Sequence, residues 1–351
     1  MSRYIAFFLP AIVHYLTYFA LPHSGGRIDF AYATLFFIFV MIPVLDLLPN
    51  LAGRESDRPI LHKVLAEKII PILSLPLQLW NIFFFAWYVQ NTPLNVSNFL
   101  LTLLTAGILS ALYGQNPAHE LIHHRTVFER VVGIALFSTS FYTGAKLAHL
   151  HSHHVLVATP QDPTSARYGK SLYQFLPGAI AVNLFGWWGK KNGSNSFWRN
   201  RKIILENVTG YVLSLLLSSL ILYFFGAKSF VFFLCQSFLG ILVLEMMNYI
   251  GHYGLERASD INGSRESISE RHAWDCDKWF SNLVLINVQR HADHHIHPNK
   301  EYTELNCVTN SPRLPLSYPL LFLLTLVPSL WRRVIHPHLD LHRSHVKGGP
   351  I

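Results

Sequence analysis

The sequence has few charged residues, few cysteines and no segment rich in glycine and serine. Of its 351 residues, 14% are charged and 51% are hydrophobic, and the mean hydropathy is +0.28. Soluble globular proteins carry about 25% charged residues, so this composition argues against a soluble protein. Because there is no linker, low-complexity tract or internal repeat, residues 1–351 are expected to form a single domain.

Other absences exclude further classes of protein. The cysteines Cys235, Cys276 and Cys307 are far apart and form no CxxC, which indicates neither a disulfide framework nor a zinc ribbon. The apolar N-terminus has no small-residue cleavage site, so we expect a retained first helix rather than a signal peptide. The formal net charge is +8, but no basic platform interleaved with aromatic residues indicates nucleic-acid binding. In a membrane protein such an excess belongs to the cytoplasmic loops and the anionic leaflet.

Six apolar runs are long enough to cross the hydrocarbon core of a bilayer, which takes about 20 residues of helix. They are residues 4–21, 30–49, 69–90, 98–115, 203–225 and 230–250. Basic residues gather in the loop at 51–68 (Arg54, Arg58, Lys63 and Lys68) and in the segments 116–202 and 251–351. The positive-inside rule therefore places these segments and both termini in the cytoplasm.

Three weaker apolar runs, at 131–147, 175–189 and 316–331, are expected to be interfacial or re-entrant helices. A seventh crossing over 131–147 would put the histidines before it and after it on opposite faces of the membrane. The C-terminal tail, with His336, His338, His342 and His345, is expected to be disordered.

Histidine, by contrast, is abundant, and nine of the 20 histidines fall into four clusters. The clusters are His119 and His123; His149, His153 and His154; His252; and His291, His294 and His295. Spacings of three and four residues place imidazoles on one face of a helix, where neutral ring nitrogens can hold a metal. One ion cannot use nine ligands, so we expect two ions with four or five ligands each.

The chemistry of the ligands limits which metals the site can bind. A shell of imidazoles with few carboxylates suits Fe, Zn, Cu or Ni rather than Mg or Ca, and iron fits a two-centre site that activates dioxygen. The H-E-x-x-H string at 119–123 also allows a zinc protease with Glu120 as general base, although a catalytic zinc needs only three protein ligands. Bis-histidine haem ligation needs histidines inside the helix bundle, and only His14 lies well inside a crossing.

These clusters, in this order, resemble the integral-membrane alkane monooxygenases, also called alkane omega-hydroxylases, of the histidine-rich membrane desaturase/hydroxylase superfamily. The resemblance extends over residues 46–305 and includes the run Ala158-Thr159-Pro160-Gln161-Asp162-Pro163, the pair Trp274-Asp275, and the string from Gln289 to Pro298. The chain departs from the family pattern at Ile122, His124, Ala148 and Gly251. At Ala148 and Gly251 the family usually has Glu, and the resulting second motif is similar to that of the xylene-type hydroxylases.

The resemblance implies an all-α membrane protein with six transmembrane helices and a cytoplasmic helical cap that carries a diiron site. It implies that a hydrocarbon from the bilayer is hydroxylated at its terminal carbon with O2. Electrons would come from a rubredoxin or a ferredoxin with its reductase, at a bacterial-type inner membrane. A xylene-type hydroxylase, a lipid desaturase and a non-catalytic metal-binding protein remain alternatives.

Further residues are assigned roles around this site. The second nitrogens of ligating histidines need orienting partners, for which Glu120, Asp293 and Glu245 are candidates. A substrate channel among the crossings is expected to be lined by Trp80, Phe84, Trp87 and Leu112. Because ligating histidines must be neutral, activity is expected to fall below roughly pH 6. The sequence assigns no role to His124, His151 and His297.

Overall fold

The structure is a computed structural model that describes residues 3–20, 29–48, 60–189, 201–259 and 265–347. Arg54 and Arg58 lie outside these residues. The described residues form helices, with isolated bridges and no named strand. The fold is therefore all-α, as expected from the sequence.

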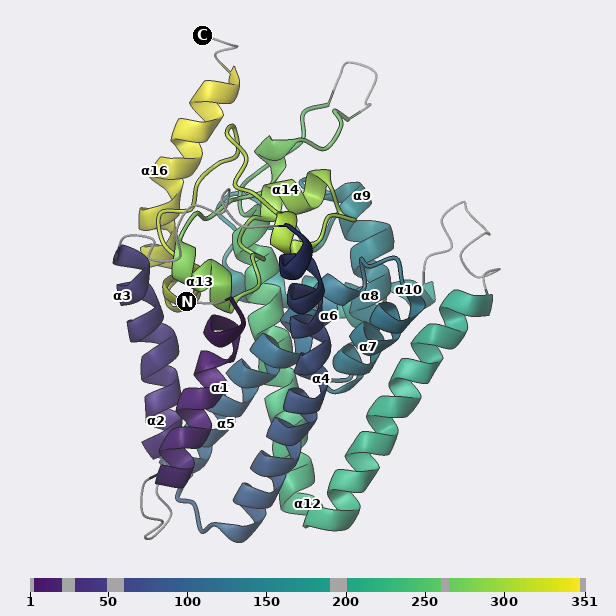
Figure 1. Ribbon diagram of the computed structural model, residues 1–351. Coiled ribbons are helices and arrows are strands. Elements are labelled where there is room, and N and C mark those ends of the chain that lie inside the picture. The colour runs from purple at the N-terminus through teal and green to yellow at the C-terminus, as the bar shows by residue number, and fades with distance from the viewer. Residues whose placement is uncertain (1–2, 21–28, 49–59, 190–200, 260–264, 348–351) are drawn as a thin grey trace.

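Long apolar helices form one end of the molecule (Figure 1). They are α1 (Arg3–Ala20); α2 (Asp29–Phe36), which runs through η1 (Phe37–Met41) into α3 (Ile42–Leu47); α4 (Ile60–Asn91); α5 (Val96–Ser110), which runs through η3 (Ala111–Gln115) into α6 (Asn116–Leu121); and α12 (Arg201–His252). Four helices in the described part of the chain are long and apolar enough to cross a membrane: Asp29–Leu47, Lys68–Asn91, Val96–Leu121 and Ile203–His252. The apolar part of α1, Ile5–Ala20, is shorter.

Helix α12 consists of two arms. Its 50-residue apolar part would extend for about 75 Å as a straight helix, more than twice the thickness of the hydrocarbon core. Gly226, with φ 78° and ψ 179°, breaks the helix, and Figure 1 shows the two arms meeting at the end remote from α14 (His291–Ile296). The arms correspond to the predicted crossings at 203–225 and 230–250. The number of crossings and the cytoplasmic cap remain predictions.

The segment 124–148 enters the bundle and returns to the side from which it came. It forms α7 (Val127–Ser138) and α8 (Gly144–Ala148). The Nε2 atoms of His123 and His149, at its two ends, are only 3.0 Å apart. At the turn, Ser214 Oγ donates to the Ser138 carbonyl at 2.7 Å, which satisfies a backbone group inside the bundle. This path brings His123 and His149 to the same side of the bundle, as the prediction of an interfacial or re-entrant helix over 131–147 requires; its position in the membrane stays a prediction.

The C-terminal tail is a helix, so the expectation of disorder was wrong. Helix α16 (Pro328–Lys347) follows α15 (Tyr318–Thr325). Its residues Trp331, Ile335 and Leu339, spaced four apart, are fully buried in the core. This apolar stripe packs the helix against the rest of the protein and outweighs the high histidine content of the segment.

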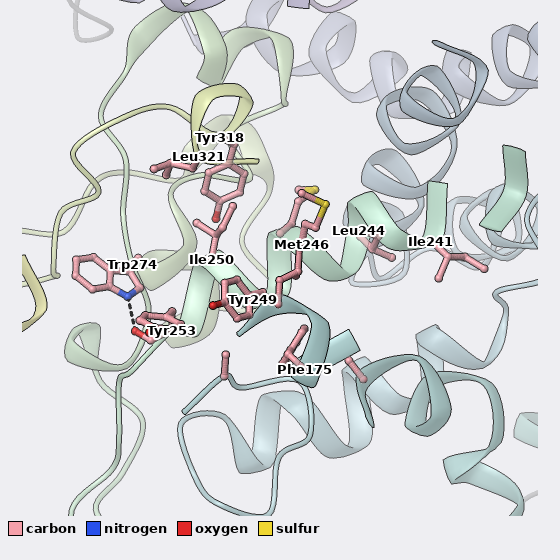
Figure 2. Close-up of a cluster of buried hydrophobic side chains, with 14 of the residues drawn as sticks. Phe175, Ile241, Leu244, Met246, Tyr249, Ile250, Tyr253, Trp274, Tyr318 and Leu321 are labelled. Carbon is pink, nitrogen blue, oxygen red and sulfur yellow. Dashed lines mark hydrogen bonds between the residues drawn. The ribbon is translucent and has the colours of Figure 1, made fainter. Parts of the chain in front are cut away.

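A core of aromatic and aliphatic side chains fixes the C-terminal end of α12, where His252 lies (Figure 2). Tyr249, Ile250 and Tyr253 of this helix pack with Trp274 and Tyr318. The indole nitrogen of Trp274 donates to the Tyr253 carbonyl at 2.9 Å. These contacts hold the end of α12 close to α14, where the Nε2 atoms of His252 and His291 are 2.9 Å apart. Helix α10 (Leu172–Gly189) packs against the same core through Phe175, and α13 (Trp279–Val284) precedes α14 in the chain.

Candidate metal centre

Nine histidines from four distant segments come together at one end of the bundle. His119 lies on α6, His149 and His153 on η4 (His149–His153), His154 on α9 (His154–Leu156), and His252 at the end of α12. His119, His123, His149 and His294 form one group; His153, His252, His291 and His295 form a second. Within each group, the four candidate ligand atoms all lie within 4.8 Å of one another.

Pairs of ring nitrogens face each other at short distances within the site. The distance between Nε2 atoms is 3.0 Å for His123 and His149, 2.9 Å for His252 and His291, and 3.2 Å for His291 and His295. Two imidazole nitrogens that each lie about 2.1 Å from one ion, at right angles, are about 3.0 Å apart. The separations therefore fit nitrogens that share an ion.

His154 lies between the two groups. Its Nε2 is 2.9 Å from Nε2 of His149, and its ring centre is 4.8 Å from that of His123 in the first group. Its ring centre is also 4.6 Å from that of His295 in the second group. The ninth histidine therefore contacts both candidate sites.

Burial favours the neutral form of six of these imidazoles. It lowers the pKa of His123, His149, His154, His291, His294 and His295 well below the usual value, and neighbouring imidazoles lower it further. Among the described residues, the buried Nε2 atoms of His153 and His294 have no hydrogen-bond partner. Imidazole nitrogens that are buried and unpartnered fit a transition metal such as iron or zinc.

Asp162 orients His153. Its Oδ2 lies 2.8 Å from His153 Nδ1, and it accepts hydrogen bonds from the hydroxyls of Thr164 and Ser165 at 2.6 Å each. Burial alone would raise the pKa of Asp162, but His153 and these hydroxyls hold it below its usual range. Carboxylate–histidine pairs of this kind fix the ring and leave the other nitrogen for a metal. The Pro160-Gln161-Asp162-Pro163 sequence was part of the resemblance, but it was not predicted to belong to the site.

Two further contacts hold ligand segments, and neither was predicted. His252 Nδ1 lies 3.0 Å from the carbonyl oxygen of His272. Asp275 Oδ1 accepts from the backbone N–H of Ala292 at 2.8 Å, in the first turn of α14. Its Oδ2 accepts from Ser311 Oγ at 2.7 Å. Asp275 therefore anchors the helix that carries three of the histidines, which gives the Trp274-Asp275 motif a structural role.

The carboxylates predicted to orient the histidines have other partners. Glu120 accepts from the Tyr302 backbone N–H at 2.9 Å and lies 3.0 Å from His124; Asp293 lies 2.9 Å from His297 and accepts from Lys300 at 2.6 Å. Glu245 accepts from the Tyr142 hydroxyl and the Asn183 amide. None of the hydrogen bonds found for these three carboxylates in the described chain reaches one of the nine histidines.

An apolar cavity of about 260 Å³ lies beside the histidine site. Helices α2 to α3, α5, α12 and α15 contribute most of its lining. Of the residues predicted for a substrate channel, Leu112 lines this cavity. Trp80 and Trp87 are 55% and 45% exposed, and Phe84 packs against the rings of Tyr18 and Tyr88. Of the four residues predicted for the channel, Leu112 therefore lines this cavity, and Trp80, Phe84 and Trp87 are not among its lining residues.

A much smaller pocket, of about 10 Å³, lies directly against the histidines. His119, His294, Glu120 and Asn116 contribute to its lining. Asn116 also lines the apolar cavity. Asn116 is therefore the one described residue that lines both the apolar cavity and the pocket against the histidines.

Comparisons with known proteins agree with this geometry. Residues 95–322 match the family model described as fatty acid desaturase. Alkane 1-monooxygenase 2 of Alcanivorax borkumensis is 32% identical over 325 residues, which cover 91% of this chain and 85% of that protein. Alkane 1-monooxygenase 1 of Pseudomonas aeruginosa is 33% identical over 336 residues, or 91% and 86% of the two chains. The chain belongs to the alkane 1-monooxygenase family.

The family resemblance expected from the histidine motifs is therefore confirmed. The alkane 1-monooxygenase family match also covers the four segments that supply the nine histidines, since it extends over about nine-tenths of the chain. A more distant relative is the xylene/toluene monooxygenase hydroxylase component XylM of Pseudomonas putida. It is 26% identical over 277 residues, which cover 75% of this chain and 71% of XylM.

Proposed function

We propose that this membrane protein is a monooxygenase that uses O2 to convert an alkane to a 1-alkanol. The observation that carries the proposal is the position of nine histidines near an apolar cavity, eight of them in two groups of four and His154 between the groups. Membership of the alkane 1-monooxygenase family supports the same reaction.

The nine histidines would hold two iron ions, one in each group, with His154 between them. Iron, when bound, supplies the redox chemistry with O2. The protein supplies neutral nitrogen ligands and orients them through Asp162 and the His272 carbonyl. Burial of the site excludes water from the reacting centre.

The shape of the two spaces favours reaction at a chain end. The large cavity is lined almost entirely by apolar side chains, so it suits a hydrocarbon. The pocket against His119 and His294 has room for about one water-sized group, which is too small for a folded chain. We therefore expect a linear hydrocarbon to approach the metal centre with its terminal carbon first.

Electrons would be delivered at the histidine end of the molecule. We infer that this end faces the cytoplasm of a bacterial inner membrane, as the distribution of basic residues predicts. The net charge of +8 would favour a small acidic electron donor such as a rubredoxin, or a ferredoxin, with its reductase.

Oxygen isotopes test this reaction. The chain is purified in detergent, loaded with iron under anaerobic conditions, and given a medium-chain alkane, rubredoxin, reductase and ¹⁸O2. The expected product is a 1-alkanol that carries one ¹⁸O atom. An alkene without label would indicate a desaturase, and the absence of any oxygenated product from alkanes or alkylarenes would refute the proposal.

A xylene-type hydroxylase is the second candidate. The similarity to XylM and Ala148 in the second histidine motif favour it. The same assay with an alkylarene separates the two candidates, since hydroxylation of the aromatic side chain in preference to the alkane would support the second.

A further inference from the structure

Asn116 occupies an unusual position at the boundary of two spaces. It is 2% exposed and begins α6, three residues before His119. In the described structure it is the one polar residue among those that line the apolar cavity, and it also lines the small pocket against the histidines.

The hydrogen bonds of this side chain are incomplete. Its Nδ2 donates to the Leu285 carbonyl at 3.0 Å, which fixes the orientation of the amide. Its Oδ1 is buried and has no hydrogen-bond partner among the described residues. A buried acceptor without a donor is unfavourable, so nearly all such groups in folded proteins have a partner.

The substrate cannot supply this partner, because an alkane has no hydrogen-bond donor. The product can, since a primary alcohol carries an O–H group on the terminal carbon. The small pocket has the volume of about one water-sized group, which a hydroxyl fills, while the apolar cavity accepts the chain. The nearby carboxylate Glu120 already accepts from the Tyr302 backbone and contacts His124.

We infer that Asn116 is a positioning residue whose Oδ1 accepts a hydrogen bond from the hydroxyl of a 1-alkanol at the junction of the two spaces. The inference rests on the proposed function, and it adds a polar binding position for the product. A hydroxyl on the second carbon would lie about one carbon deeper in the apolar cavity, away from the amide oxygen.

The test compares two alcohols of the same chain length and nearly equal hydrophobicity. The full chain is loaded with zinc, which has no redox chemistry, and the affinities of 1-decanol and 2-decanol are measured by calorimetry in detergent. One neutral hydrogen bond predicts a preference for 1-decanol of about five- to tenfold. Asn116→Leu, which removes the acceptor, is expected to abolish this preference.

Leu112→Val is the matched control, because Leu112 lines the same cavity but has no polar atom. It is expected to weaken the binding of both alcohols alike and to keep their ratio. Equal affinities of the wild-type chain for the two alcohols would overturn the inference even if Asn116→Leu fails to fold. The assay with ¹⁸O2 tests the proposed function separately, so the two failures are distinguishable.

Discussion

At the scale of single residues, Asp162 is expected to control metal affinity through His153. Asp162→Asn would weaken the contact at 2.8 Å that orients the ring, so affinity for the bound metal should fall about 10–100-fold. Competition with a chelator of known affinity measures this change. Asp293→Asn is the comparison, because Asp293 contacts His297 and Lys300 instead. An equal loss in the two variants would contradict the role of Asp162.

Gly251 is expected to be required for the position of His291. A Cβ atom at residue 251 would lie 2.9 Å from His291 Cδ2 and 3.1 Å from its Nε2. Gly251→Ala should therefore displace the imidazole and reduce metal binding by the group that contains His291, as measured by metal content. Gly178→Ala is the control, since a Cβ there meets nothing within 4 Å. Unchanged metal content in Gly251→Ala would show that His291 does not hold metal in this position.

At the scale of helices, the hairpin of α12 depends on Gly226. Its backbone conformation, with φ of 78° and ψ near 180°, is one that residues other than glycine rarely adopt. Gly226→Ala is expected to destabilise the protein by about 1–3 kcal/mol, because a Cβ there would meet only ordinary contacts and the cost is backbone strain. Thermal unfolding in detergent measures the effect, and a midpoint equal to that of the wild type would contradict it.

The helices were predictable where one signal dominated the sequence. The apolar runs predicted the long helices, and the need to bring His123 and His149 to one side argued against a seventh crossing over 131–147. The fourth crossing was predicted to end at residue 115, where the apolar run ends, whereas the apolar helix continues through α6 to Leu121. Helix α16 was missed because its buried stripe of Trp331, Ile335 and Leu339 lies within a histidine-rich segment.

The orienting contacts and the cavity could not be predicted from the sequence, for a different reason. Asp162 lies nine residues from His153, and its approach depends on the turn that follows α9. The cavity is lined by helices that are distant in the chain, and their relative positions cannot be read from apolar runs. Trp80 and Trp87 were expected to line a channel because they lie on a predicted crossing, and an apolar run does not separate an inward face from an exposed one.

At the scale of the whole molecule, stability is expected to fall on both sides of neutral pH. On the acid side, burial lowers the pKa of His123, His291 and the other buried histidines of the site. Below about pH 6.5 the unfolded chain binds protons that these histidines cannot accept in the folded state, so the metal-free protein loses stability as pH falls. This direction agrees with the loss of activity expected below roughly pH 6.

On the alkaline side, His124 has the opposite effect. Burial lowers its pKa, but Glu120 and Glu129 outweigh burial and raise it to about 9. The stability that the charged ring contributes is fully present below about pH 6.5 and is lost as pH rises through about 9. Thermal unfolding of the metal-free chain across pH measures both effects. His124→Gln should reduce the loss of stability at alkaline pH and leave the loss at acid pH unchanged. A variant that keeps the alkaline loss and loses the acid one would contradict these assignments.

The iron content of the purified chain tests the central claim most directly. After anaerobic loading, the wild type is expected to retain about two irons per chain. His123→Ala and His291→Ala, one from each group of histidines, should each retain about one. His151→Ala, which changes an exposed histidine beside the site, should retain the wild-type amount. A wild-type content of one iron or less, or full retention in both ligand variants, would contradict a diiron centre held by these nine histidines.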